Sequence, residues 1–511
     1  MKFNSILFLK SEDSKIEDTL EAPAFFIDLN LDQIIDAIVA GKWDYNLKPF
    51  FYFPVKDSDT IKYRQEIVKD LENRILLDTI KSFAQKMVIM RRYLAMCKKL
   101  TYKYHLEGWF LETVIVYCDA VNSLAQELSQ IDLHSQGLRD FREFLSNYAG
   151  SEKFTTLAAE TKSLKSDLSS IKYSIITKGN FVRVRKYDSE IDYSLEVLKT
   201  FEKFKQGAVK DYTQYLTVSA GMNHVQAQVL DLVAKLNPEI FKNLDNFYTK
   251  YRYFCDETIC RFDREIQFYV AYIEYMERFK KAGLHFCYPL ITQQSKEIYN
   301  YEGFDLALAN KCISENLTIV PNDFHLKDKE RIIIVSGPNQ GGKTTFARVF
   351  GQLHYLANLG LPVPGIKAQL FLFDNLFTHF EKEEDIRNLR GKLQDDLVRI
   401  YNIPNQATSN SIIIMNEIFT STSLKDAVYL SKIVIEKIIQ LDLLCMCVSF
   451  IDELALLSEK TISMVSTVVP ENPTVRTYKI IKKPPDGLAY AIHIAEKYRL
   501  TYELLKERIK S

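Results

Sequence analysis

The sequence predicts a mostly α-helical N-terminal part with a small β hairpin, followed by an α/β domain with a largely parallel sheet. From about residue 58 to 290, apolar residues recur at helical spacing and glycine and proline are rare. Beyond about residue 300, short apolar segments alternate with helical ones. These two regimes indicate that the chain combines a helical region with a separate α/β domain.

The helical part contains two long runs with few helix breakers. Residues 60–100 form one run, and residues 190–283 form another that is interrupted only at LNPEI. Runs of this length favour extended helices over a compact bundle. Between them, residues 171–187 alternate in β-branched and polar residues around a Lys178-Gly179-Asn180 turn, which predicts a hairpin.

Composition excludes several classes of protein. Lys+Arg and Asp+Glu balance at 66 each, so any polyanion site must be a local patch. The eight cysteines form no CxxC pair, and most have apolar neighbours, so we expect reduced, buried thiols. The N-terminal apolar run is too short for a signal peptide, and no uncharged stretch is long enough to span a membrane. We therefore expect a soluble, cytoplasmic protein without a membrane partner.

The strongest motif is GPNQGGKT, which fits G-x-x-x-x-G-K-T, follows the apolar strand RIIIVS and opens a helix. Its glycines let backbone N–H groups close around phosphates, and the helix N-terminus adds positive potential. The lysine reaches the β- and γ-phosphates, and the threonine hydroxyl binds Mg²⁺. We expect nucleotide contacts from Gly337, Pro338, Asn339, Gln340, Gly341, Gly342, Lys343, Thr344 and Thr345.

A second apolar strand, IIIM, ends in Asn416 and Glu417. Glu417 is the candidate to orient the attacking water. Position 416 usually carries an aspartate that holds Mg²⁺ through water, and an amide oxygen supplies no negative charge there. The alternative is that 412–417 is only a core strand with an exposed end. We favour a catalytic set of Lys343, Asn416 and Glu417, with Thr344 and Asn416 at the metal and hydrolysis slow.

The P-loop resembles that of the MutS family of DNA mismatch-repair ATPases, and the similarity extends over about 200 residues. The resemblance implies an ABC-type ATPase domain, ATP and Mg²⁺ as cofactors, composite sites in a homodimer, and double-stranded DNA as partner. The further matching segments are VPND at 320–323, LPVPG at 361–365, LFT at 376–378, NEI at 416–418, STS at 421–423 and GLAYAIHIA at 487–495.

The chain departs from the family pattern at Asn416 and at three other places. Where the family has a serine signature that faces the partner subunit's γ-phosphate, this chain has Arg390, Gly391 and Lys392, so Arg390 or Lys392 is expected to make that contact. Phe450 stands where the family has a histidine, and the chain stops soon after His493. His493 fits a packed position as well as a catalytic one.

The resemblance also implies a domain order. We expect a helical core and first lever over 1–150, a clamp-like basic region over 151–192, returning lever and core helices over 193–295, and the ATPase domain over 296–511. No Phe-x-Glu wedge precedes the core, so we expect a short member without the mismatch-recognition domain.

The hairpin is locally basic, which predicts a DNA contact through phosphates. A solvated basic hairpin is the alternative. The aromatic residues of 245–287 are expected to pack between helices rather than to stack on bases. The DNA-binding candidates are Lys172, Lys178, Arg183, Arg185 and Lys186.

The sequence thus predicts an ATP-dependent DNA clamp of repair or recombination. Two alternatives stay open: a nucleotide-gated binding protein with negligible hydrolysis, and a structural ATPase that acts on protein partners.

Overall fold

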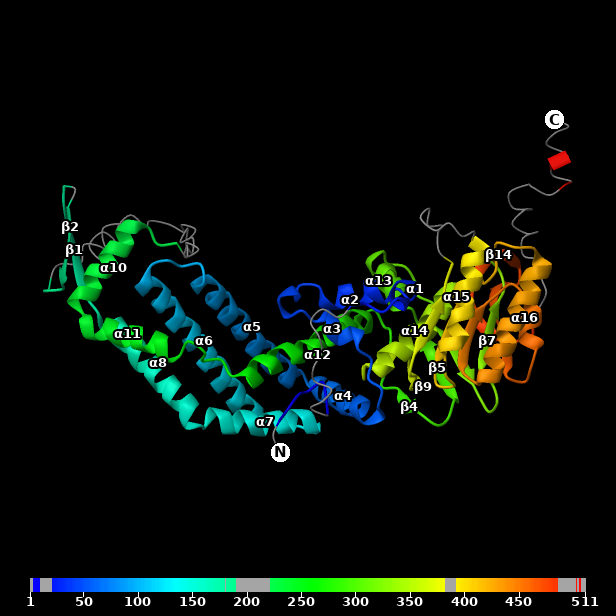
Figure 1. The fold of residues 1–511 in the computed structure, drawn as a ribbon, viewed down its shortest axis with the longest axis horizontal. Helices are drawn as coiled ribbons and strands as arrows, with labels where there is room; N and C mark the ends of the chain where they lie inside the picture. The colour runs from blue at the N-terminus through cyan, green and yellow to red at the C-terminus, as the bar shows by residue number, and fades with distance from the viewer. Residues whose placement is uncertain are drawn as a thin grey trace, which may run out of the picture. The chain divides into compact units, whose positions relative to one another are not determined.

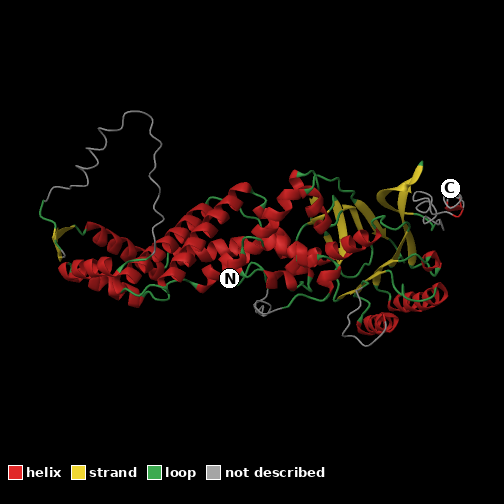
Figure 2. Ribbon diagram, turned by 90° about the horizontal axis from the view of Figure 1, so that it is seen from above, coloured by secondary structure: helices red, strands yellow, loops and turns green. Residues whose placement is uncertain are grey.

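The computed structural model shows a chain made of two compact units (Figure 1). A helical unit comprises mainly Glu72–Leu133 and Leu138–Asp263, and a mixed unit comprises Asn4–Leu71, His134–Gly137 and Arg264–Ser511. Most strands lie in the mixed unit, and the β1–β2 hairpin is the exception (Figure 2). The predicted four-part division stays a prediction. The structure describes residues 3–9, 21–179, 181–189, 221–381 and 392–485, together with 502, 505 and 506.

Long helices joined by short turns build the helical unit. Successive helices α5 and α6 pack against each other, and α8 and α11 both pack on α6. Among the described helices, none is long and apolar enough to cross a membrane. The helices are α5 (Arg74–Cys97), α6 (Lys103–Ser129), α7 (Gln136–Ala149), α8 (Glu152–Ser170), α10 (His224–Leu236), α11 (Pro238–Lys250) and α12 (Glu257–Lys281), the last of which continues into the mixed unit.

The prediction of one uninterrupted run over 60–100 is wrong. Helix α4 (Ser58–Leu71) ends before α5 begins, because Asn73 adopts an extended conformation and its side chain accepts a hydrogen bond from the Ile75 N–H. The break predicted at LNPEI is confirmed, since Pro238 begins α11. A second break separates α11 from α12, and no proline or glycine in that segment predicts it.

Aromatic side chains fill the interior of the helical unit. Phe247 and Phe254 are buried, and their ring centroids lie 6.3 and 5.6 Å from that of Phe110. These contacts confirm the predicted helix packing for this segment. Tyr253 departs from that prediction, because its side chain is 87% exposed.

The expectation of reduced cysteines is wrong for one pair. Cys255 and Cys260 form a disulfide, because the turn before α12 brings their Cα atoms to 6.9 Å. The other six are free and five of these are buried, as expected: Cys97, Cys118, Cys312, Cys445 and Cys447.

The predicted hairpin is confirmed. Strands β1 (Tyr173–Lys178) and β2 (Phe181–Lys186) pair antiparallel, with Tyr173 opposite Lys186 and Lys178 opposite Phe181. Most of its side chains are exposed.

In the mixed unit, the first part of the chain packs on the helix α14 (Lys343–Asn358), which follows the P-loop. The Tyr355 hydroxyl donates to the Phe51 carbonyl at 2.7 Å, and Gln352 Nε2 donates to the Leu29 carbonyl at 2.9 Å. The fully buried Arg64 donates to the Leu359 carbonyl just beyond α14, at 3.0 Å. The N-terminal helices are α1 (Phe25–Asp28), α2 (Leu31–Val39), α3 (Lys48–Tyr52) and α4, with a short 3₁₀ turn at Trp43–Tyr45.

A six-stranded sheet in the order β10-β11-β12-β7-β13-β14 forms the centre of the mixed unit. Its pairs are parallel except for the edge strand β14, which confirms the predicted largely parallel sheet. The strands are β7 (Ile332–Ser336), β10 (Leu376–His379), β11 (Ile412–Asn416), β12 (Leu444–Val448), β13 (Thr461–Val469) and β14 (Asn472–Lys482).

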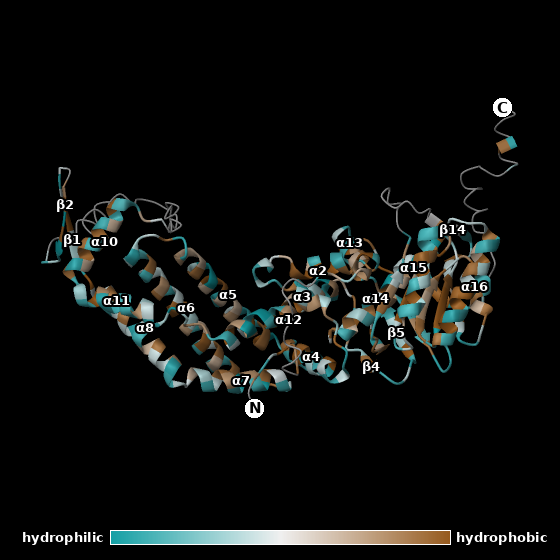
Figure 3. Ribbon diagram, in the orientation of Figure 1, coloured by the Kyte–Doolittle hydropathy of each residue, from teal (hydrophilic) through white to brown (hydrophobic). Residues whose placement is uncertain are grey.

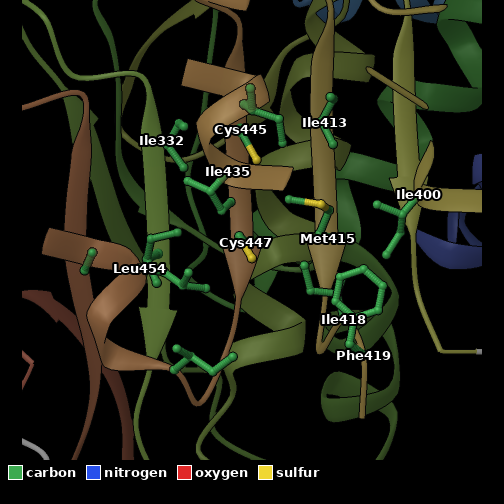
Figure 4. Close-up of a cluster of buried hydrophobic side chains, with 14 of the residues drawn as sticks. Ile332, Ile400, Ile413, Met415, Ile418, Phe419, Ile435, Cys445, Cys447 and Leu454 are labelled. Atoms are coloured by element: carbon green, nitrogen blue, oxygen red, sulfur yellow. The ribbon is translucent and has the colours of Figure 1, made fainter. Parts of the chain in front are cut away.

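Branched aliphatic and sulfur side chains on one face of this sheet form the core shown in Figure 4. Ile332, Ile413 and Cys445 come from three neighbouring strands, and Ile435 comes from the covering helix α16 (Leu424–Leu441). Each of these isoleucines contributes roughly 1.5–3 kcal/mol by leaving water. The sheet strands are accordingly hydrophobic in Figure 3. The other elements beside this face are α15 (Lys392–Gln406) and a 3₁₀ turn at Asp452–Leu456.

The segment LFLFDNLFTHF, residues 370–380, divides between two sheets. Strand β9 (Lys367–Phe371) joins a four-stranded sheet, β4-β9-β5-β6, and β10 joins the six-stranded one. The remaining elements are β3 (Phe286–Cys287), which pairs with β8 (Val363–Pro364), β4 (Leu290–Thr292), β5 (Ile298–Gly303), β6 (Asn322–Leu326) and α13 (Leu306–Ser314).

Three cations gather around Asp442, which ends α16 in a left-handed conformation. Lys460 Nζ lies 2.7 Å and Arg331 Nε 3.3 Å from its Oδ1, and Lys296 Nζ lies 3.1 Å from Oδ2. Burial raises the pKa of Asp442, but the bonds from the two lysines and the charge of Arg331 outweigh it and lower the pKa to about 2.

Candidate nucleotide-binding site

The glycine-rich loop connects the end of β7 to the start of α14, as predicted. Gly337 and Gly342 have φ values of 116° and 88°, which a side chain would strain. A Cβ at Gly341 would lie 2.3 Å from Ser466 Oγ, which donates a 2.7 Å hydrogen bond to the Gly341 carbonyl. Strand β13 therefore supports the loop from outside, and only glycine fits at position 341.

Lys343 lies inside this loop and is bonded to it. Its ammonium donates to the carbonyls of Gly337 and Pro338 at 3.0 and 3.1 Å, and to Asn339 Oδ1 at 3.4 Å. The residue is only 6% exposed. Burial lowers the pKa of Lys343, the charge of Glu417 raises it, and a nearby arginine lowers it further. An anion in this loop would replace carbonyl dipoles with full charges.

Thr344 and Asn416, the two residues predicted at the metal, lie together. Thr344 Oγ1 donates to Asn416 Oδ1 at 2.9 Å. Parallel pairing of β11 with β12, and of β12 with β7, puts the end of β11 at the same sheet edge as the P-loop. Glu417 follows with a φ of 52° and donates its N–H to the Val448 carbonyl at 2.9 Å, so its backbone is held.

These oxygens suit Mg²⁺, which prefers hard oxygen ligands and is usually held by one or two protein groups together with phosphate. Among the described residues, no group of three or more His, Cys, Asp or Glu side chains could hold a metal alone. The donor set therefore fits a cation that arrives with a phosphate ligand.

A cavity of about 730 Å³ opens beside the loop. Its polar end consists of the P-loop, Lys343, Thr344 and Glu417, and its other end is largely apolar. A volume of this size suits a small organic ligand with an anionic group. The apolar end is lined by Phe304, Leu308, Cys312, Leu317, Ile319, Val320, Phe346 and Val349.

Four further residues of the site escaped sequence reasoning. Arg476 Nε donates to the Asn339 carbonyl at 3.1 Å, and Tyr478 lines the cavity. Asn322 ties the two sheets together, because its Nδ2 donates to the Tyr478 carbonyl at 3.0 Å and its Oδ1 accepts from the Ile480 N–H. The fourth is Ser466. Of these four residues, only Asn322 lies in a segment that matches the family pattern, VPND at 320–323.

The structure does not place several of the predicted residues in the site. Phe450 follows β12 and is 53% exposed. Arg390, Gly391 and His493 lie outside the described residues, and of Lys392 only the backbone is described, as the first residue of α15.

The hairpin carries the second group of predicted residues. Opposite residues of an antiparallel pair share a face, so Lys178, Arg183 and Arg185 lie on one face of it. Lys172 extends that face, since its carbonyl accepts from the Tyr187 N–H at 3.4 Å. Lys186 pairs with Tyr173 and lies on the opposite face, so the five predicted DNA-binding residues are divided between the two faces of the hairpin, and their role stays a prediction.

Comparison with known proteins relates the C-terminal part to one family. Residues 333–510 match the model of MutS domain V. The chain is 30% identical over 191 residues to the DNA mismatch repair protein MutS of Syntrophomonas wolfei, which covers 36% of this chain and 22% of that protein. It is 29% identical over 236 residues to the MutS of Protochlamydia amoebophila, 44% of this chain and 27% of the relative. The matches thus span less than a third of these relatives.

Proposed function

We propose that this chain is an ATPase that binds DNA and that ATP controls how tightly it holds the DNA. The premise is that the chain belongs to the MutS family through its C-terminal domain. The premise rests on the domain V match and the relatives named above. The observation that carries the proposal is the P-loop cavity with the Thr344–Asn416 pair at its polar end.

In this proposal the chain's own residues bind ATP and position water. Lys343 exchanges its carbonyl partners for the β- and γ-phosphates, and the loop amides hold the remaining oxygens. Thr344 and Asn416 would hold Mg²⁺, which would neutralise phosphate charge. Glu417 orients the attacking water.

Hydrolysis is slow in this proposal because two polar groups of the family pattern are replaced. Asn416 would contribute no charge beside the metal, and Phe450, which stands where the family has a histidine, offers no polar contact to a γ-phosphate. The same observations favour the second candidate, a nucleotide-gated binding protein with negligible turnover.

The proposed active form is a homodimer with composite sites. Arg390 or Lys392 of one subunit would contact the γ-phosphate bound by the other. The Lys172, Lys178, Arg183 and Arg185 face of the hairpin would hold DNA phosphates, and closure of the ATPase domains would open or close this clamp in repair or recombination. A structural ATPase acting on protein partners is the alternative if the hairpin does not bind DNA.

The test measures phosphate release and DNA binding together, with matched, mismatched and branched duplexes. Replacing Arg183 and Arg185 by Glu should abolish DNA stimulation and reduce the slope of log affinity against log salt by about 2, because two phosphate contacts are lost. Basal turnover should stay the same. The matched control reverses Lys98 and Lys99, two exposed lysines just after α5. Unchanged DNA affinity and salt slope in the hairpin variant would remove the clamp from the proposal.

A further inference from the structure

The β1–β2 hairpin has two chemically different faces. One, which we call the basic face, holds three cations, and the other, the apolar face, holds one. Register alone decides this division, since opposite residues share a face and successive residues alternate. The basic face carries Ser174, Ile176, Lys178, Phe181, Arg183 and Arg185, and the apolar face carries Tyr173, Ile175, Thr177, Val182, Val184 and Lys186.

Phe181 lies on the basic face and is exposed, although large apolar side chains are usually buried. It is 81% exposed, although burying a phenylalanine contributes roughly 1.5–3 kcal/mol. It begins β2 immediately after the turn and lies opposite Lys178. The largest apolar side chain of the hairpin therefore projects from its tip, between charged neighbours.

Cations and an aromatic ring follow one another along this face. Phe181, Arg183 and Arg185 are two residues apart, so successive side chains are separated by roughly 6.6 Å along the strand. Proteins that hold single-stranded nucleic acid combine such a cationic track with aromatic rings on which bases stack. Phosphate binding alone would need only the cations.

We propose that the basic face binds DNA that has unpaired bases, with Phe181 stacked on one base and Arg183 and Arg185 on the flanking phosphates. The inference rests on the proposed function and names its substrate class: single-stranded, gapped or branched DNA rather than matched duplex. In a continuous duplex the base faces are covered by their neighbours, and inserting a ring would require unstacking at a cost of a few kcal/mol. At a strand end or branch point, a base face is already available.

The test measures the anisotropy of labelled oligodeoxythymidine, matched duplex and forked duplex bound to the full chain. Phe181→Ala should weaken binding to oligodeoxythymidine and to the fork by about 5- to 150-fold, the range for stacking of one base on one ring. Binding to matched duplex should stay within about twofold, and the salt slope should not change because no phosphate contact is lost. Tyr173→Ala is the matched control, since it removes an exposed ring from the apolar face and should leave all three affinities unchanged.

Phe181→Trp gives a direct readout that does not depend on loss of function. It should retain the affinity for oligodeoxythymidine, and its added fluorescence should be quenched by that probe and not by matched duplex. The inference is overturned if Phe181→Ala leaves oligodeoxythymidine binding intact, if it weakens duplex binding equally, or if Tyr173→Ala has the same effect. If the inference fails in one of these ways but the chain still binds matched duplex, the proposed function stands. If the chain binds none of the three DNAs, the inference and the proposed function are both overturned.

Discussion

Replacing Asn416 by Asp should strengthen Mg²⁺ binding and raise ATP turnover. The side chains have the same shape, and Thr344 Oγ1 can donate to the carboxylate as it does to the amide oxygen, at 2.9 Å. The added charge faces a divalent ion across one water. Two unit charges about 4 Å apart interact by about 4 kcal/mol near a protein surface. Most of this is offset by desolvation, and groups that act through a bound ligand change metal affinity by about 10- to 100-fold.

The assay is steady-state phosphate release at saturating ATP across a Mg²⁺ titration. The concentration of Mg²⁺ for half-maximal turnover should fall about 10-fold in Asn416→Asp and rise in Asn416→Ala. Asn410→Asp is the matched control, because it adds the same charge at the exposed amino end of the same strand. Its Mg²⁺ dependence should equal that of the wild type.

A lower turnover in Asn416→Asp with unchanged Mg²⁺ dependence would refute this reasoning. The amide would then have a role of its own, such as keeping a second negative charge away from Glu417. The explanation of slow hydrolysis from the missing charge would fail at the same time.

The structure gives three further predictions, and the sequence gives a fourth. Lys343→Ala should weaken ATP binding at least about 100-fold by calorimetry, since it removes charge-assisted bonds to two phosphates, while Lys329→Ala, which removes an exposed surface lysine, should not. Ser466→Ala should lower the free energy of unfolding by about 1–2 kcal/mol in denaturant titration and raise KM for ATP, because the Gly341 carbonyl loses its buried donor. Asp442→Asn should reduce stability by only about 1 kcal/mol at neutral pH, because the carboxylate is 38% exposed and screened. Its depressed pKa stabilises the fold above the unfolded value near 3.9, so the difference from wild type in denaturant titration should shrink below about pH 5 and be lost as the pH falls through about 2. A difference that is undiminished at pH 2 would contradict the assignment. Finally, a single mispair within duplex should be bound no better than matched duplex in direct competition, and a clear preference would show that a mismatch-reading element is present.

Local chemistry made part of this site predictable. The eight residues of GPNQGGKT carry their own conformational requirements, and the strand before them and helix after them have unambiguous patterns. The hairpin is equally local, because its turn and alternation lie within seventeen residues. The strand before Asn416 and Glu417 could be predicted for the same reason, because its buried residues are consecutive in the sequence.

The rest of the site depends on strand order, which no local pattern encodes. Ser466 supports Gly341 from 125 residues away because β13 pairs with β7, and Arg476 reaches Asn339 from 137 residues away because β14 pairs with β13. The break at Asn73, by contrast, is local, because the Asn73 side chain caps α5 by accepting a hydrogen bond from the Ile75 N–H two residues away.

The sequence by itself therefore determined the phosphate-binding loop, its following helix, the acidic strand end and the basic hairpin, because each is specified by neighbours along the chain. Only the tertiary structure decided that Lys343 is buried within its loop and that Thr344 meets Asn416. These depend on which strands pair and in which register, and burial of the apolar sheet face sets that pairing through contacts among residues far apart in sequence.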